Sequence, residues 1–302
     1  MNKLSSWLKA ARLRALPLAS ACILTGSALA LGAGSFRGSI FLLALGTALL
    51  LQILSNLAND LGDFDKGVDN ADRVGPARAL QSGLLTRKEI IAGIWVISLF
   101  SLLVGALLIY RTSGPGKSAT TVLFAVLGFS AIAAALKYTL GKKPYGYSGF
   151  GDLFVFFFFG PVGVAGTCYL HTGAFDATTL LPSAAVGWLS VGVLNINNLR
   201  DHDSDLRSGK RTLPVRMGPK GALHYQMGLV MGALVVSVAY LAVHDRLFTL
   251  PSALPLVAFL PLTKITVDLS RKSNPSEIDP FLRKHAMLTL LYAVLFAIGI
   301  NF

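Results

Sequence analysis

Residues 40 to 62, IFLLALGTALLLQILSNLANDLG, begin as an apolar run and end in asparagine and aspartate. An apolar run of about 20 residues is long enough to cross the hydrocarbon core of a bilayer as a helix. Carboxylates at the end of such a run are costly unless they meet water, a cation or another partner, so they indicate a functional site. This stretch therefore predicts both a membrane-spanning helix and a polar site at its end.

Similar apolar runs recur along the whole chain of 302 residues, of which 53% are hydrophobic and 14% charged. This composition leaves too little polar surface for a water-soluble globule. The predicted spans are residues 15–35, 40–62, 90–110, 119–140, 150–170, 180–199, 221–243, 247–268 and 286–302. The first is read as a retained helix because no clear small-residue cleavage site follows it. We predict an all-α integral membrane protein with nine transmembrane helices, forming a single polytopic domain over residues 1–302.

The basic residues lie almost entirely on one side of this predicted topology. The chain carries a net charge of +12, and 23 of its 27 lysines and arginines fall on the side of the N-terminus. Under the positive-inside rule that side is cytoplasmic, so the charge excess reports topology and no nucleic-acid partner is expected. We predict a multi-pass protein of the cell inner (cytoplasmic) membrane, in contact with membrane lipid and with a cytoplasmic N-terminus.

Two short windows hold eight of the 15 acidic residues, each beginning at the cytoplasmic end of an apolar run. The windows contain Asp60, Asp63, Asp65, Asp69 and Asp72, and then Asp201, Asp203 and Asp205. Helical spacing puts on one face Asn56, Asp60 and Asp63 in the first window, and Asn198, Asp201 and Asp205 in the second. Facing rows of oxygen ligands suit Mg²⁺ that also holds phosphate oxygens. The alternative, solvated loops that cap membrane helices, carries equal weight for Asp65, Asp72 and Asp203.

The two windows also look like copies of one unit. Asn56 precedes Asp60 by four residues, as Asn197 precedes Asp201, and a basic, turn-rich segment follows each window. Four predicted helices separate the second span from the sixth. We therefore predict a four-helix internal repeat.

SNLANDLGDFDKGVDNADR, from residue 55, resembles the first aspartate-rich motif of the UbiA superfamily of membrane prenyltransferases. NNLRDHDSDLRSGKRTLPVRMG, from residue 197, resembles the second. ARLRALPLA, GPARALQSG and KYTLGKKPYGYSGFGDLFVFFFFGPVGVAGTCYL are similar to the branch that prenylates 1,4-dihydroxy-2-naphthoate in menaquinone synthesis. The resemblance covers the chain to about residue 225.

This resemblance implies nine helices around a central cavity, Mg²⁺ between the two motifs and a polyprenyl diphosphate donor. The metal ligands it implies are Asn56, Asp60, Asp63, Asn198, Asp201 and Asp205. The sequence departs from the common pattern at the last carboxylate of the first motif. Asp65 and Asp69 are both candidates for that ligand, and we favour Asp69 because it follows Gly67.

Further candidates come from residues that match the family pattern or follow the clusters. Asp60, Asp201 and Asp205 are predicted to be catalytic, together with Tyr138 and Lys142, which match a Tyr-x3-Lys element. The predicted substrate-binding residues are Arg14, Arg73, Lys142, Lys210 and Arg211. A lysine or arginine here suits a diphosphate, and Arg14 suits a carboxylate on an aromatic acid. Positive-inside anchoring explains Lys142 and Arg14 equally well.

The resulting hypothesis is an enzyme that transfers a polyprenyl group from its diphosphate to 1,4-dihydroxy-2-naphthoate, with loss of CO₂ and diphosphate, to give demethylmenaquinone. The aspartate motifs cannot choose between aromatic acceptors, so 4-hydroxybenzoate and homogentisate stay open. A cation-coupled transporter is a third alternative, because intramembrane carboxylates and repeats also characterise carriers. Both clusters lie at helix ends rather than near the membrane midplane, which favours the enzyme.

Overall fold

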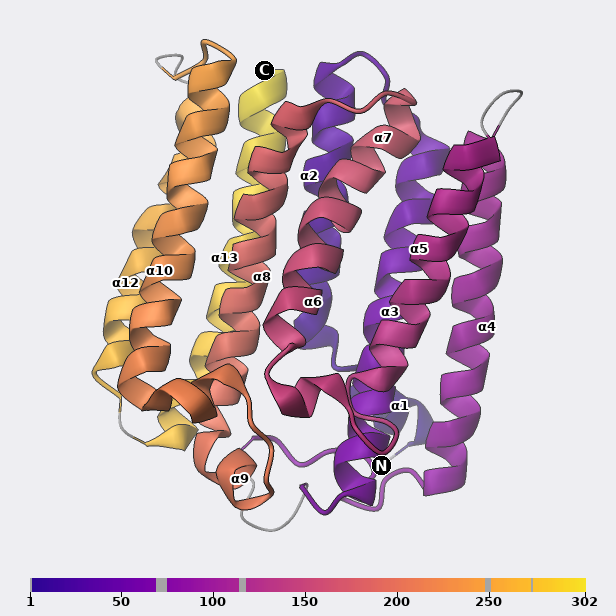
Figure 1. The fold of residues 1–302 in the computed structure, drawn as a ribbon, viewed down its shortest axis with the longest axis vertical. Coiled ribbons are helices and arrows are strands. Elements are labelled where there is room, and N and C mark those ends of the chain that lie inside the picture. Colours follow the sequence, from indigo (N-terminus) through magenta and orange to yellow (C-terminus); the bar gives the residue numbers. More distant parts are fainter. Residues whose placement is uncertain (1, 69–74, 114–117, 248–250, 273) are drawn as a thin grey trace.

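The computed structural model describes residues 2–68, 75–113, 118–247, 251–272 and 274–302, and the regular structure in these ranges is helical (Figure 1). Within them, nine helical spans are long and apolar enough to cross a membrane, which confirms the predicted number. The spans are Lys3–Gly32, Gly38–Asp65, Arg87–Thr112, Ser118–Lys137, Gly151–Thr172, Ala177–Arg200, Leu213–Val243, Pro251–Ser270 and Pro275–Asn301. The predicted four-helix repeat is not tested by this arrangement and stays a prediction.

Several spans are built from more than one segment. The helices are α1 (Lys3–Ala11), α2 (Leu16–Gly32), α3 (Gly38–Asp65), α4 (Arg87–Thr112), α5 (Ser118–Lys137), α6 (Gly151–Phe157), η3 (Phe158–Ala165), α7 (Gly166–Thr172), α8 (Leu180–Arg200), α9 (His202–Arg207), α10 (Leu213–Val243), α11 (Leu254–Val257), α12 (Phe259–Ser270) and α13 (Pro275–Asn301). Helix α10 is kinked at Gly218, which has φ 73°, so its long apolar part begins close to the predicted residue 221.

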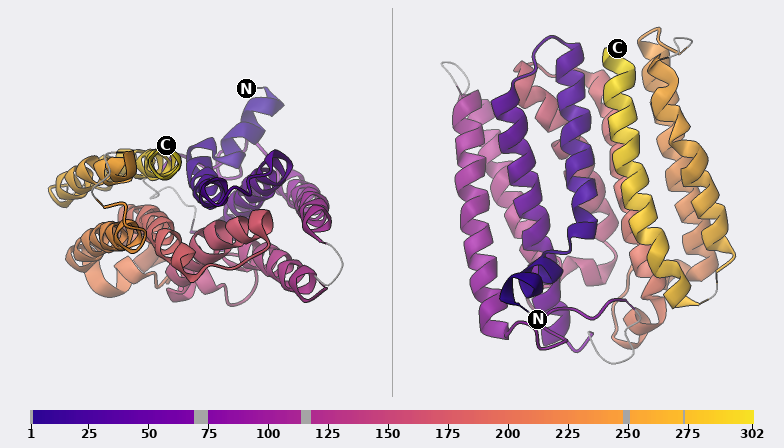
Figure 2. Two further views of the ribbon diagram at one scale, coloured as in Figure 1. Left: turned by 90° about the horizontal axis from the view of Figure 1, so that it is seen from above. Right: turned by 180° about the vertical axis from the view of Figure 1, so that it is seen from behind.

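Helix α1 is the first segment of the span Lys3–Gly32 and is separated from α2 by a break at Arg12, which the sequence analysis did not foresee. Arg12 ends it in the left-handed conformation, at φ 49°. The helix projects sideways from the bundle at the end where the N-terminus lies (Figure 2). Leu4 and Leu8 are exposed on it, while the ring of Trp7 lies against Gly93 of α4. Exposed leucines beside basic residues are typical of a helix that lies at a membrane interface.

The bundle has an enclosed side and a lipid-facing side. Helix α8 packs between α10, α13 and the η3 segment, and its Leu189 is fully buried. Helices α4 and α5 instead lie at one edge and expose large apolar side chains, including Trp95 at 73% and Phe129 at 62%. Exposure of this kind is what lipid contact requires of a membrane helix.

The fifth span, Gly151–Thr172, changes from α-helix to π-helix and back to α-helix along its length. Residues Phe158–Ala165 form a π-helix that contains Pro161, whose missing N–H removes one backbone hydrogen bond. Glycine allows this segment to approach α2 closely, because a Cβ on Gly163 would lie 2.9 Å from the Cβ of Cys22. Cys22 is buried at this contact, as a small packing residue.

Candidate active site

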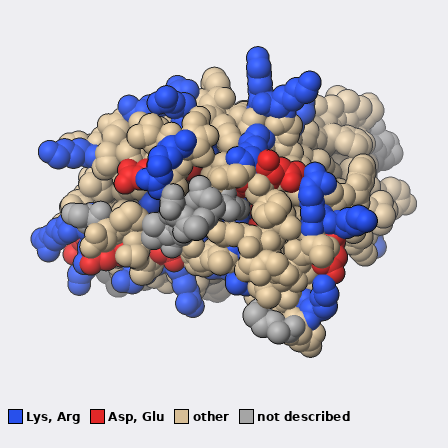
Figure 3. All heavy atoms as spheres, turned by 90° about the horizontal axis from the view of Figure 1, so that it is seen from below, with Lys and Arg blue, Asp and Glu red and all other residues tan. Residues whose placement is uncertain are grey.

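A cavity of about 370 Å³ lies between α2, α3, α4, α5, the α6–α7 span and α8. Its described lining residues include none from α10 or α12. One end of the cavity is polar and the remainder is apolar. The polar end is lined by Arg12, Arg14, Gln52, Ser55, Asn56, Asn59, Asp63, Arg78, Asn197 and Lys210. The polar residues of α3 and α8 lie at the end of the bundle where the N-terminus lies, and lysines and arginines gather over that end (Figure 3).

The first aspartate cluster meets the cavity through Asn59 and Asp63, which are one helical turn apart on α3. Asp63 is 2% exposed and receives two short contacts. Arg78 Nη1 lies 2.6 Å from Asp63 Oδ2, and the Tyr147 hydroxyl donates a hydrogen bond of 2.6 Å to Oδ1. Arg78 also donates to the backbone oxygen of Asn59, at 2.6 Å. The segment after the first motif therefore folds back onto the carboxylate that precedes it.

Asp60 is turned away from the cavity lining. It is buried, and its Oδ2 accepts a hydrogen bond of 3.4 Å from the backbone N–H of Leu80, while its Oδ1 has no hydrogen-bond partner. Asn56 does line the cavity and donates from Nδ2 to the backbone oxygen of Ala11, at 2.8 Å. Of the predicted helical face of the first cluster, Asn56 and Asp63 line the cavity, and Asn59 lines it beside them.

The second cluster lies where α8 ends and α9 begins. The buried guanidinium of Arg200 binds Asp201 with two hydrogen bonds, of 2.8 Å from Nε and 2.6 Å from Nη2. Asp205 is 1% exposed, and Lys210 Nζ lies 3.5 Å from its Oδ1. Asp205 Oδ2 and Asn198 Oδ1 are buried without a hydrogen-bond partner. Asn198 is not among the described cavity-lining residues, whereas its neighbour Asn197 is.

Charges from both clusters meet at Lys210 and Asp205. Burial raises the pKa of Asp205 to about 6, with a further rise from Asp201 and Asp63 that Lys210 partly offsets. Burial disfavours the charged form of Lys210, but Asp63 and Asp205 outweigh it, so the pKa of Lys210 is raised. The ammonium also lies 5.3 Å from the centre of the Tyr147 ring. Lys210 therefore remains a cation between the two clusters.

The buried oxygens suit a hard cation. Asp60, Asn198 and Asp205 each carry an oxygen without a hydrogen-bond partner, and carboxylate and amide oxygens are ligands that Mg²⁺ accepts. Among the described residues, no group of three acidic, histidine or cysteine side chains stands close enough to hold a metal alone. Mg²⁺ is commonly held by one or two carboxylates together with substrate phosphates, so the donor set fits a metal that binds with a diphosphate.

An aromatic wall leads from the polar end into the apolar part of the cavity. The rings of Tyr138, Tyr145, Phe154 and Phe158 line it. The Tyr145 ring is stacked on Phe154 with 4.1 Å between centroids, and Tyr138 meets Tyr145 edge to face. Burial raises the pKa of Tyr138 and of Tyr145, so both phenols are neutral. Such π faces can stabilise a nearby cation.

The remaining predicted residues divide between this site and the surface. Arg14 lines the cavity, and its Nη1 lies 3.3 Å from Asp279 Oδ2. Lys142 and Arg211 are exposed and are absent from the described lining of the main cavity. Asp65 forms an exposed ion pair with Arg87, at 2.9 Å. Asp69 and Arg73 lie outside the described residues.

Sequence reasoning missed three contributors, two of which the fold brings here from a distance. Tyr147 and Asp279 contact the clusters from loops and helices far along the chain, and no local pattern marks them. Asn59 could have been found, because it precedes Asp63 by four residues as Asn197 precedes Asp201.

Comparison with known proteins gives concordant results. The model of the UbiA prenyltransferase family matches residues 19–298. A 1,4-dihydroxy-2-naphthoate octaprenyltransferase of Haemophilus influenzae is 42% identical, with 99% of this chain and 96% of that protein covered. The protein of the same name from Escherichia coli is 41% identical over the same shares, and that from Mycobacterium tuberculosis is 39% identical over 80% of each chain.

Two solved structures share the fold at low sequence identity. A UbiA homolog from Aeropyrum pernix, in its apo form, has a TM-score of 0.66 at 19% identity and covers 96% of this chain and 98% of its own. A UbiA homolog from Archaeoglobus fulgidus, bound to GPP and Mg²⁺, has a TM-score of 0.65 at 16% identity and covers 98% and 99%. At these identities the likeness shows the fold alone.

Proposed function

Because the chain belongs to the UbiA prenyltransferase family, we propose that it transfers a polyprenyl group from polyprenyl diphosphate to 1,4-dihydroxy-2-naphthoate. Diphosphate and CO₂ leave, and the product is the reduced form of demethylmenaquinone. The names of the three relatives support this choice of acceptor. The observation that carries the proposal is a cavity whose polar end is lined by Asp63 of the first cluster, by Asn197 and Lys210 beside the second, and by Arg14, and whose remainder is apolar.

The polar end suits the departure of a diphosphate. Asp205, whose buried Oδ2 has no hydrogen-bond partner, would hold Mg²⁺ together with diphosphate oxygens, and Asp63 and Asp201 would join it by exchanging arginine contacts for the metal. Bound Mg²⁺ would supply positive charge that stabilises the leaving diphosphate. Lys210 and Arg78 place two further cations at the same end, and such fixed charges act where negative charge develops.

The apolar remainder suits the prenyl group and the ring that attacks it. The allylic carbon–oxygen bond of the donor breaks, and both bonding electrons go to the diphosphate. The aromatic wall of Tyr138, Tyr145 and Phe154 faces the carbon that becomes electron-poor and keeps water from it. The ring carbon that bears the carboxylate then forms the new bond, and the electron pair of its bond to the carboxyl carbon returns to the ring as CO₂ leaves.

Arg14 is the residue we assign to the acceptor carboxylate. Its guanidinium lines the cavity and is 31% exposed, so it can reach a bound aromatic acid. Arginine binds planar carboxylates through two parallel hydrogen bonds. The proposed location is the cell inner membrane with a cytoplasmic N-terminus, which the gathering of basic residues at that end supports.

The test uses dihydroxynaphthoate labelled at its carboxyl carbon. Purified protein with Mg²⁺ and a polyprenyl diphosphate should release labelled CO₂ in step with the prenylated product, and chelation of Mg²⁺ should stop both. Prenylation of 4-hydroxybenzoate or homogentisate, with the naphthoate ignored, would contradict the proposed acceptor.

A further inference from the structure

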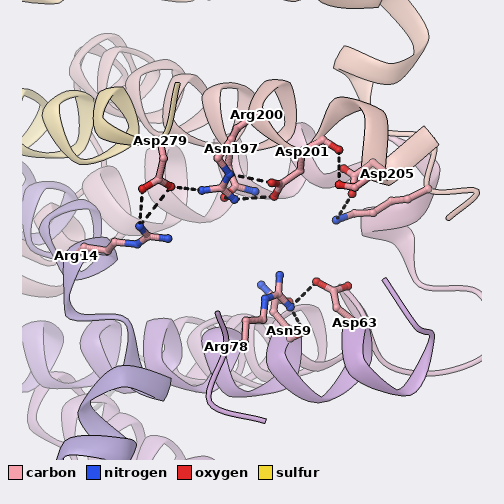
Figure 4. A network of polar contacts seen from close by, with 11 residues as sticks. Arg14, Asn59, Asp63, Arg78, Asn197, Arg200, Asp201, Asp205 and Asp279 are labelled. Carbon is pink, nitrogen blue, oxygen red and sulfur yellow. Dashed lines mark hydrogen bonds and ion pairs between the residues drawn. The ribbon is translucent and has the colours of Figure 1, made fainter. Parts of the chain in front are cut away.

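One carboxylate near the start of α13 holds two arginines from distant parts of the chain (Figure 4). Asp279 accepts hydrogen bonds from Arg14 Nη1, at 3.3 Å to Oδ2 and 3.5 Å to Oδ1. It also accepts from Arg200 Nη1, at 2.5 Å to Oδ1. Arg14 lines the cavity and Arg200 belongs to the second aspartate cluster, so Asp279 joins these two parts of the site.

Arg200 connects Asp279 to the groups proposed to hold diphosphate. Its side chain is fully buried. Nη1 is bound to Asp279, Nε and Nη2 are bound to Asp201, and Nη2 also donates to Asn197 Oδ1 at 3.0 Å. A guanidinium is planar and rigid, so a shift on its Asp279 side also moves its Asp201 side.

Two charged groups in this network are each shared between two partners of opposite charge. Asp279 is shared between Arg14 and Arg200, and Arg200 is shared between Asp279 and Asp201. An aromatic carboxylate that binds Arg14 takes the place of Asp279 there. Asp279 then interacts more fully with Arg200, and Arg200 holds Asp201 less strongly, which leaves the oxygens of Asp201 more available to a metal.

We propose that Asp279 is a positioning residue that couples the two substrate sites, so that an aromatic carboxylate at Arg14 increases the affinity of the second cluster for Mg²⁺ with diphosphate. The proposal rests on the proposed function only in placing the acceptor carboxylate at Arg14. Coupling between two sites is reciprocal, so diphosphate must raise the affinity for the naphthoate by the same factor.

Binding measurements test the coupling without turnover. Calorimetry of the purified full chain should give the dissociation constant of inorganic diphosphate with Mg²⁺, with and without saturating 1,4-dihydroxy-2-naphthoate. No prenyl group is present, so no product forms. We expect the naphthoate to tighten diphosphate binding by about fivefold or more, which is the lower range of typical coupling between sites.

Asp279→Asn should reduce the tightening of diphosphate binding by naphthoate to less than about twofold. The amide keeps the shape of the side chain but loses the charge that the two arginines share. Asp279→Glu should retain part of the coupling. Glu277→Gln is the matched control, since Glu277 lies on the same helix, is exposed and pairs with Lys272 at 3.7 Å. Its coupling should equal that of the unaltered protein.

Arg14→Gln gives a second route that leaves Arg200 and Asp279 in place. It should also lose the coupling, and because Asp279 then interacts with Arg200 alone, its diphosphate affinity without naphthoate should already approach that of the unaltered protein at saturating naphthoate. Equal coupling in Asp279→Asn and the unaltered protein would overturn the proposal, as would an unaltered protein that binds both ligands independently. If that protein still releases labelled CO₂ during prenylation, only the coupling fails and the proposed function stands.

Discussion

The two aspartate clusters lie at the same end of the bundle, yet each obtains its positive charge differently. In the first, Asp63 belongs to a helix and its partner Arg78 comes from the following loop. In the second, Arg200 is the last residue of α8 and stands beside Asp201 in the sequence. The first cluster therefore depends on how a loop folds back, and the second on Asp279 of a helix near the end of the chain. Similar spacing in sequence does not mean similar support in the fold.

The largest expected effects come from removing one proposed metal ligand from each cluster. Asp63→Asn and Asp205→Asn should each lower kcat by about 100- to 1000-fold, the range for loss of one strong electrostatic contact in a transition state. Prenylation of the naphthoate by equal amounts of folded protein measures this loss. Asp176→Ala, at the opposite end, is the control and should keep full activity. If either aspartate variant retains most activity, the two clusters do not form one site.

The segment that follows the first cluster contacts Arg200 of the second cluster at Gly75, and a substitution there can disturb this contact. A Cβ there would lie 2.9 Å from Arg200 Cζ, and the buried guanidinium is held by three partners and cannot move freely. Overpacking of this kind costs about 1–3 kcal/mol, so Gly75→Ala should lower kcat/KM by about fivefold to 100-fold. Gly228→Ala on α10 adds its methyl group to open space and should have no effect. Unchanged kcat/KM in Gly75→Ala would mean that Arg200 can shift without consequence.

Protonation should distinguish the second cluster from the first. Burial raises the pKa of Asp205 to about 6, so the carboxylate gains a proton as pH falls through this value. A protonated carboxylic acid is a poor metal ligand, and Mg²⁺ with diphosphate should bind about tenfold more weakly at pH 5 than at pH 7.5. Calorimetry at several pH values measures this change. The tenfold change should vanish in Asp205→Asn, and its persistence there would place the titrating group elsewhere.

The smallest effect is expected at Lys142, which the sequence analysis treats as catalytic. The side chain is exposed and outside the described lining of the main cavity, so Lys142→Ala should lower kcat by less than about threefold. Lys210→Ala, which removes the buried cation between the clusters, should lower kcat far more. A large loss in Lys142→Ala would show that this lysine approaches the site when substrate binds.

Helical periodicity predicted the spans and one polar face of α3, but it could not choose between Asp60 and Asn59. Both lie within the stripe that contains Asn56 and Asp63, because each is one turn from either residue. Packing decides the matter: Asn59 lines the cavity, whereas Asp60 accepts a hydrogen bond from the backbone N–H of Leu80 and is not among the described lining residues. The sequence carries no local sign of that contact.

The segment GPARALQSG resembled the naphthoate branch, but its role could not be derived from its residues. The structure gives several of them a place. Gly75 lies against Arg200, Arg78 binds Asp63, and Leu80 binds Asp60. The segment therefore covers both clusters, and each contact joins residues too far apart in sequence for pattern reasoning to pair.

Helix α1 connects a lipid-exposed surface to the wall of the cavity. Its exposed leucines are suited to contact with the membrane surface, and the backbone oxygen of Ala11 accepts a hydrogen bond from Asn56 in the cavity wall. A bilayer of different hydrophobic thickness changes the height of that surface relative to the bundle. If the lipid positions α1, such a change acts on the same hydrogen bond, and we expect activity to depend on the acyl-chain length of the surrounding lipid.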